Sequence, residues 1–229
     1  MLRPIYVVRE KAVKDKQMKY VKSAVKVFLK LCGLLGRVVV VESDLTDEAG
    51  RDIRSYLSEA RIGKRRKKRI DGDRLHDLVA EDLDSRFEHI DKRPQYIIIL
   101  NRDLRFSSDD PLLIDGLAHG THGVIVSVAR TRSRTYSEKY FKMLVLHELG
   151  HMYGLISDAR KASVTGRKYG RHCANECIMQ GGTSFPKIRR GLFGAVLDRA
   201  IIEKFCPQCR RYLIRKSKLI IQRSRPRGL

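Results

Sequence analysis

An apolar segment that carries two histidines and a glutamate places the strongest constraint on the fold of this 229-residue chain. The segment, about residues 136–153, has the spacing of a helix and contains His147, Glu148 and His151. Apolar residues surround these three: Met143, Leu144, Val145, Leu146 and Leu149. Because polar groups are costly to bury without a purpose, the segment predicts a buried helix with a functional cluster.

The spacing of the two histidines favours metal binding. His147 and His151 are four residues apart, so on a helix they point the same way and can ligate one Zn²⁺. Glu148 follows the first histidine, where a carboxylate is placed to take a proton from a water rather than to ligate. Gly154 can adopt a positive φ and turn the chain, so that a third ligand can come from the following segment.

Four of the five cysteines form two close pairs. Cys173 with Cys177, and Cys206 with Cys209, have the spacing of metal ligands. The second pair also fits a redox motif, but no βαβ pattern surrounds it and the first pair offers it a partner, so zinc is preferred. Cys32 lies in an apolar helical pattern and is expected to be an ordinary buried residue.

Strand-like and helix-like segments alternate up to Gly154, which predicts an α/β (α+β) fold with a mixed twisted sheet and packed helices. The expected strands are 4–9, 37–41, 96–100 and 123–130, and the expected helices are 11–33, 47–60, 73–86 and 136–153. Beyond Gly154 the stretch 156–171 is polar and loop-like, and a last helix is expected at 189–205. We expect two subdomains: residues 1–154 with the sheet and active-site helix, and residues 155–229 with the cysteines.

The chain has a formal net charge of +22, which attracts polyanions whether or not this is its function. The basic residues are spread along the chain, so solvated basic faces are the favoured interpretation, including a loop at 61–69. Nucleic acid or acidic protein is the alternative partner. No stretch has the roughly 18 to 20 apolar residues of a membrane helix, and no signal peptide is recognised. A cytoplasmic protein with no membrane partner is expected.

The motifs across residues 147–209 resemble the archaemetzincin family of zinc peptidases. The family pattern is HExxH, a glycine, a third His directly followed by Cys, a second Cys, a Met two residues later and a final CxxC. In this chain, Gly154, His172, Cys173 and Met179 match that order after the HExxH helix.

The resemblance implies a metzincin-like sheet and two Zn²⁺ ions, one catalytic and one structural. His172 would complete the catalytic site with the two helical histidines, and Glu148 would be the base. Met179 would form an apolar floor beneath the histidines, in the Met-turn of the family. The four paired cysteines would bind the structural zinc, because a closed Cys₄ site leaves no position for water.

This chain departs from the family pattern between the glycine and the third histidine. The residues 156–171 intervene where the family has only a few, and the first cysteine pair is one residue tighter. This insertion could loop out and cap the cleft, since added loop length costs little. It could instead displace His172 and leave the third position to Asp158. We prefer His172, because a structural zinc at Cys173 would anchor its neighbour.

Three functions follow from these patterns. The first is a zinc metallopeptidase, a hydrolase whose peptide or protein substrate would pair with strand 123–130 as the sheet edge. The second is a nucleic-acid-binding zinc protein with a vestigial site, suggested by the charge. The third is an adaptor in which both zincs only hold the fold. His119 and His122 could form another metal pair, although loop histidines are preferred, and the chain is expected to be a monomer.

Overall fold

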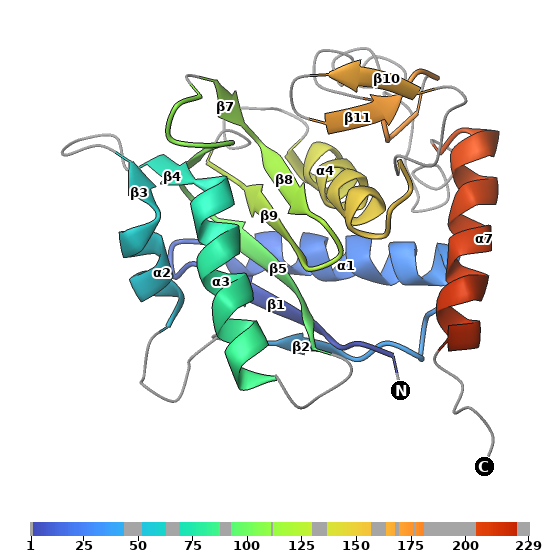
Figure 1. Cartoon of the computed structure of the whole chain (residues 1–229), viewed down its shortest axis with the longest axis horizontal. Helices are drawn as coiled ribbons and strands as arrows, with labels where there is room; N and C mark the ends of the chain where they lie inside the picture. Colours follow the sequence, from blue (N-terminus) through green and yellow to red (C-terminus); the bar gives the residue numbers. More distant parts are fainter. Residues whose placement is uncertain are drawn as a thin grey trace.

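The computed structural model contains a twisted sheet that is covered by helices on both faces (Figure 1). The structure describes residues 2–43, 52–62, 69–87, 93–110, 112–129, 137–156, 164–167, 170–175, 177–180 and 205–223. Residues 189–204 of the expected last helix, most of the basic block 61–69, and Asp158 lie outside these ranges.

The main sheet has the strand order β2-β1-β5-β9-β8. Its strands are β1 (Ile5–Arg9), β2 (Val40–Glu42), β5 (Gln95–Leu100), β8 (Gly116–His119) and β9 (Gly123–Ser127). β2, β1, β5 and β9 run parallel to one another, whereas β8 pairs antiparallel with β9. The sheet is therefore mixed, which confirms the fold class expected from the sequence.

The expectation that residues 123–130 form the sheet edge is wrong. β9 lies between β5 and β8 and is buried along its whole length, in keeping with the apolar residues Val124, Ile125 and Val126 at its centre. The edge is β8, whose four residues include a glycine and a histidine and therefore carry little strand signal.

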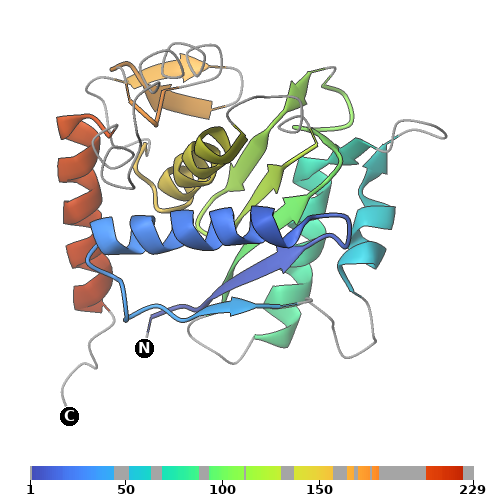
Figure 2. The same ribbon diagram turned by 180° about the vertical axis from the view of Figure 1, so that it is seen from behind.

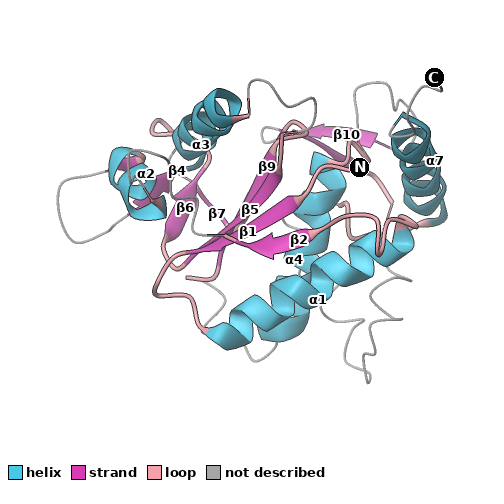
Figure 3. Ribbon diagram, turned by 90° about the horizontal axis from the view of Figure 1, so that it is seen from below, coloured by secondary structure: helices cyan, strands magenta, loops and turns pink. Residues whose placement is uncertain are grey.

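Side chains alternate between the two faces of the sheet and build two apolar layers. One face packs under α1 (Asp15–Leu31) and α4 (Ser137–Met152) with these strand residues: Ile5, Val7, Ile97, Ile99, Val124 and Val126. The other packs under α2 (Ile53–Glu59) and α3 (Gly72–Arg86) with these: Val8, Ile98, Leu100 and Ile125. Figure 3 shows the sheet between these helix pairs, and Figure 2 shows α1 lying across the first face.

A second sheet in the order β3-β4-β6-β7 lies beside α2 and α3 (Figure 1). Its strands are β3 (Arg61–Ile62), β4 (Arg69–Asp71), β6 (Asp103–Arg105) and β7 (Leu113–Ile114). These strands are too short for their sequences to show an alternating pattern, and none of them was expected.

The segment after α4 is more ordered than its polar composition indicates. β10 (Val164–Arg167) and β11 (Gly170–Cys173) form an antiparallel hairpin in the stretch expected to be a loop, with Thr165 opposite His172. The later helix α7 (Pro207–Arg223) was not expected either. Its buried side is formed by Cys209, Leu213 and Ser217, and this polar mixture conceals the helical period.

The core crosses the expected subdomain boundary. Phe205 and Leu213 belong to the same apolar cluster as Phe28 and Val145, so the C-terminal helix packs on the layer that contains α1 and α4. The division at Gly154 stays a prediction. Within the described residues, no helix combines the length and the apolar character needed to span a membrane.

A buried histidine lies between α3 and the sheet. His76 is fully buried, and its Nδ1 atom is 2.7 Å from the Tyr96 hydroxyl oxygen. Burial, together with the nearby His119, lowers the pKa of His76 to about 3. The folded protein therefore holds this imidazole neutral at pH values where an unfolded chain would protonate it.

We predict that His76 makes the protein sensitive to mild acid. The folded pKa of about 3 lies below the ordinary value of 6.5, so stability is lost as pH falls below 6.5. The loss approaches about 1.4 kcal/mol per pH unit for this one group. A His76→Gln variant should show a shallower dependence of unfolding free energy on pH, measured by urea unfolding between about pH 6.5 and 4.5. Equal slopes for the two proteins would contradict the prediction.

Candidate metal centre

Three histidines from two distant parts of the chain converge above the sheet. His147 and His151 lie on α4, and His172 lies on β11. One ligand atom from each lies within 4.8 Å of the others, and the Nε2 atoms of His147 and His151 are 3.1 Å apart. Zinc–nitrogen bonds of about 2.0–2.1 Å at tetrahedral angles would separate two such nitrogens by about 3.3 Å. The donor atoms therefore fit a zinc ion.

Burial prepares these histidines to ligate. It lowers the pKa of His147 to about 4 and holds the pKa of His151 well below its ordinary value, and the neighbouring imidazoles lower both further. Neutral imidazoles keep the lone pair that a metal needs. The Nδ1 atom of His147 donates a hydrogen bond of 2.6 Å to the Ile178 carbonyl, so its free lone pair is on Nε2, which faces His151.

A buried carboxylate lies beside the histidines. Glu148 is 6% exposed and is not part of the group of possible ligands found among the described residues. Burial first, and then the charge of Asp115, raise the pKa of Glu148 to about 8. The hydroxyl of Tyr140, two turns earlier on α4, donates a hydrogen bond to Asp115. This carboxylate therefore lies in the kind of environment that tunes catalytic acids and bases.

The edge strand approaches Glu148 closely. A Cβ atom at Gly116 would lie 2.6 Å from the Glu148 Oε1 atom, which is closer than real Cβ atoms come. Only glycine lets β8 and α4 come this near. The end of β8 that contains Gly116 therefore lies next to the carboxylate.

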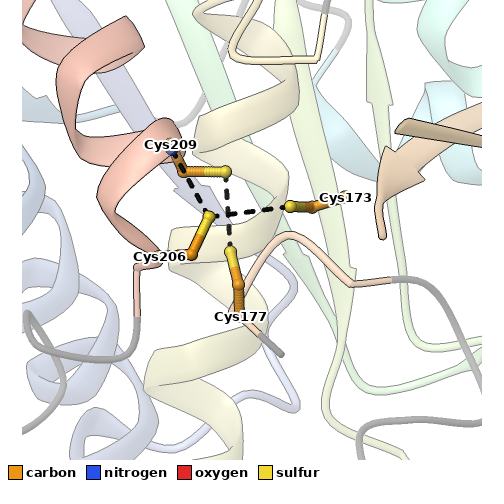
Figure 4. A group of neighbouring side chains, drawn as sticks. All are labelled: Cys173, Cys177, Cys206 and Cys209. Atoms are coloured by element: carbon orange, nitrogen blue, oxygen red, sulfur yellow. Dashed lines mark hydrogen bonds between the residues drawn. The ribbon is translucent and has the colours of Figure 1, made fainter. Parts of the chain in front are cut away.

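The four paired cysteines form a second cluster, shown in Figure 4. The Sγ atoms of Cys173 and Cys206 are 3.7 Å apart, and those of Cys177 and Cys209 are 3.5 Å apart. Zinc–sulfur bonds of about 2.3 Å at tetrahedral angles would give about 3.8 Å, whereas a disulfide needs about 2.05 Å. All four are buried and none of them forms a disulfide, so the cluster fits a closed zinc site.

Hydrogen bonds within the loop that carries Cys173 and Cys177 fix its shape. The Cys173 amide donates to the Met179 carbonyl at 2.8 Å, and the Met179 amide donates to the Cys177 sulfur at 3.3 Å. These bonds hold Cys173, Cys177 and Met179 close together in a compact turn. Of the two remaining cysteines, Cys206 directly precedes α7 and Cys209 lies in its first turn, so the cluster joins the turn to this helix.

The same turn shapes the histidine site. Ile178 supplies the carbonyl that orients His147, and His172 directly precedes Cys173. The sulfur of Met179 lies against Gly150 of α4, where any Cβ would collide with it. Met179 is fully buried and lies beneath the helix that carries the two histidines. The cysteine cluster and the histidine cluster therefore share one structural support.

Three further residues named in the sequence analysis, Gly154, His119 and His122, have different roles in the structure. Gly154 has a φ of +66°, and its amide donates to the His151 carbonyl, so it ends the α4 segment as its position suggested. Within the described residues, His119 and His122 belong to no ligand group. The His119 ring stacks on His76, and Arg93 donates to the Nε2 atom of His122 at 3.1 Å. His122 lies in the turn after β8, as expected of a loop histidine, whereas His119 is the last residue of β8.

Three features of the site were missed by the sequence reasoning: Asp115, Tyr140 and the Ile178 carbonyl. Asp115, just before β8, and Tyr140 on α4 are brought together only by the tertiary fold. A hydrogen bond to the backbone carbonyl of Ile178 does not depend on the type of that residue, so the sequence does not reveal it. The one available signal was the glycine at 116, which marks a close approach in a strand-like context.

The fold resembles that of archaemetzincin. The crystal structure of archaemetzincin from Methanopyrus kandleri matches with a TM-score of 0.52 and 17% sequence identity, over 95% of this chain and 96% of that chain. No family model and no curated protein sequence matches the chain. The match confirms an archaemetzincin-like fold, in agreement with the motif resemblance across residues 147–209.

We predict that the cysteine cluster supports metal binding by the histidines. A Cys209→Ser variant should lose one zinc and bind zinc at the histidine site about 10- to 100-fold more weakly, because the turn that holds His172 and Ile178 loses its anchor. Zinc content by elemental analysis and titration against a chelator would measure both effects.

Two further variants serve as controls for that measurement. Cys32→Ser, buried outside the cluster, should retain both sites. Cys209→His should restore binding, since a Cys₃His set also holds zinc. Unchanged affinity at the histidine site of Cys209→Ser would show that the two clusters are independent.

Proposed function

We propose that this chain is a zinc-dependent metallopeptidase, a hydrolase that cleaves peptide bonds in peptide or protein substrates. One observation carries the proposal: the convergence of His147, His151 and His172 within 4.8 Å beside the buried carboxylate of Glu148. The archaemetzincin-like fold supports the same function. We further propose two zinc ions, a catalytic one at the histidines and a structural one at the cysteines.

A bound zinc ion would supply a Lewis acid that lowers the pKa of a water and polarises the substrate carbonyl. The protein would contribute the proton transfers. Glu148 would take a proton from the attacking water and then deliver it to the leaving amine nitrogen. Its buried position beside Asp115 favours the protonated carboxyl and so suits the second transfer. Met179 and the apolar residues of α4 would exclude bulk water from beneath the site.

The substrate would bind along β8. In the described sheet, this strand pairs with β9 on one side and has no strand partner on the other. An extended peptide can add to such an edge through main-chain hydrogen bonds. Gly116 would then bring the peptide backbone next to Glu148. We propose this edge as the substrate-binding strand in place of residues 123–130, with which the substrate was expected to pair.

The four paired cysteines indicate the kind of cellular compartment in which the protein works. Four cysteines that are arranged as metal ligands and form no disulfide fit a reducing compartment, where disulfides rarely form. We therefore propose a cytoplasmic enzyme.

We predict that Glu148→Gln abolishes hydrolysis but retains metal. Loss of a general base should lower kcat by about 10²- to 10⁴-fold, while zinc content stays at the wild-type value. Quenched fluorescent peptides and elemental analysis would measure the two quantities. Glu138→Gln is the matched control, because Glu138 is exposed on the same helix and forms a surface ion pair with Lys142 at 3.2 Å. A fully zinc-loaded wild-type protein without peptidase activity would refute the proposed function.

We also predict that Gly116→Ala impairs catalysis through the position of Glu148. The added methyl group would occupy the space of the carboxylate, and a displacement of about 1 Å can cost about 10²-fold in rate. Zinc content should not change, because the three atoms nearest to an added Cβ at Gly116 all belong to Glu148 and none to a histidine. Ala118→Gly, two residues along the same strand, removes a methyl group and serves as control. Equal kcat values for Gly116→Ala and wild type would contradict this role.

A further inference from the structure

The C-terminal helix α7 carries an unusual charge distribution. Its seventeen residues include no acidic side chain. They include six basic residues: Arg210, Arg211, Arg215, Lys216, Lys218 and Arg223. Cys209, Leu213 and Ser217 are buried, so one side of α7 faces the protein and the opposite side faces solvent. The helix stands at one end of the molecule in Figures 1 and 2.

Three of these basic residues form a stripe along the solvent side. Arg211, Arg215 and Lys218 are spaced by four and three residues, so they lie above one another on the helix, and all three are exposed. With a rise of 1.5 Å per residue, the stripe spans about 10 Å. We refer to these three residues as the α7 stripe.

The α7 stripe is not neutralised within the part of the chain that the structure describes. None of its three residues takes part in an ion pair there. Like charges at these spacings repel each other and weaken a helix. A polyanion would remove that repulsion by binding along the stripe.

We propose that the α7 stripe binds the phosphate backbone of a nucleic acid without reading its sequence. Arginine can hold a phosphate through two parallel hydrogen bonds, and two of the three residues are arginine. The stripe is short and straight, so it can contact a few consecutive phosphates of one strand.

An anionic membrane fits this helix less well than a nucleic acid. A helix that lies on a membrane turns a continuous apolar face to the lipid, whereas the apolar side of α7 is buried in the protein. The exposed aliphatic residues Ile214 and Leu219 lie on opposite flanks of the stripe, so they form no continuous patch. The proposal goes beyond the proposed peptidase activity and does not depend on it.

The test measures binding of the zinc-loaded full chain to a labelled DNA duplex and a labelled single-stranded RNA by fluorescence anisotropy. The triple variant Arg211→Gln, Arg215→Gln, Lys218→Gln should bind at least about tenfold more weakly at low salt. For the duplex, the slope of log K against log salt should decrease by about 2.7, since each phosphate contact contributes about 0.9. Circular dichroism and zinc content should match wild type, and peptide hydrolysis should be unchanged.

The matched control removes the same charge from α1. Lys19, Lys26 and Lys30 are exposed on that helix, and the triple variant Lys19→Gln, Lys26→Gln, Lys30→Gln should retain most of the affinity and slope. An equal loss in the two variants would show that the whole-molecule charge binds the nucleic acid and would overturn the proposal. It would also be overturned if wild type bound vesicles containing phosphatidylserine but neither nucleic acid at physiological salt.

Discussion

The hydrogen bond from His147 Nδ1 to the Ile178 carbonyl is the contact on which the arrangement of the site depends. It joins the central helix α4 to a turn that lies thirty-one residues later in the chain, inside the apolar cluster that contains α4. In that surrounding an unpaired imidazole N–H would be costly, so the bond selects one orientation of the ring and one turn geometry. The positions of His172 and Met179 follow from that turn.

The parts of the site that sequence reasoning could predict are those set by local geometry. His147 and His151 share a helix face because of the helical repeat alone, and the apolar residues around them predicted their burial. The alternation of strands and helices likewise predicted a layered fold, because each apolar run must be covered. His172 is different: its position depends on a hairpin register and on cysteines more than thirty residues away, and only the motif resemblance suggested it.

The failures of the sequence reasoning have a common physical cause. β8 is a strand because β9 lies beside it, and its own four residues could equally form a loop. α7 packs through a cysteine, a leucine and a serine, of which only Leu213 has the apolar character that marks a buried face. In both places tertiary contacts select the structure, and local pattern carries little of that information. The contact between Gly116 and Glu148 is hidden for the same reason, since it joins an unrecognised strand to a helix.

The adjacency of His172 and Cys173 also sets an order of events during synthesis. The turn that presents His172 has its first two sulfurs at Cys173 and Cys177, but the cluster closes only when Cys206 and Cys209 arrive with α7. A chain emerging from the ribosome thus completes α4 well before it can complete the support of the third histidine. Assembly of the histidine cluster therefore depends on α7, the last helix of the described structure. Until α7 has been made, His147 and His151 lack a firmly positioned third histidine, His172.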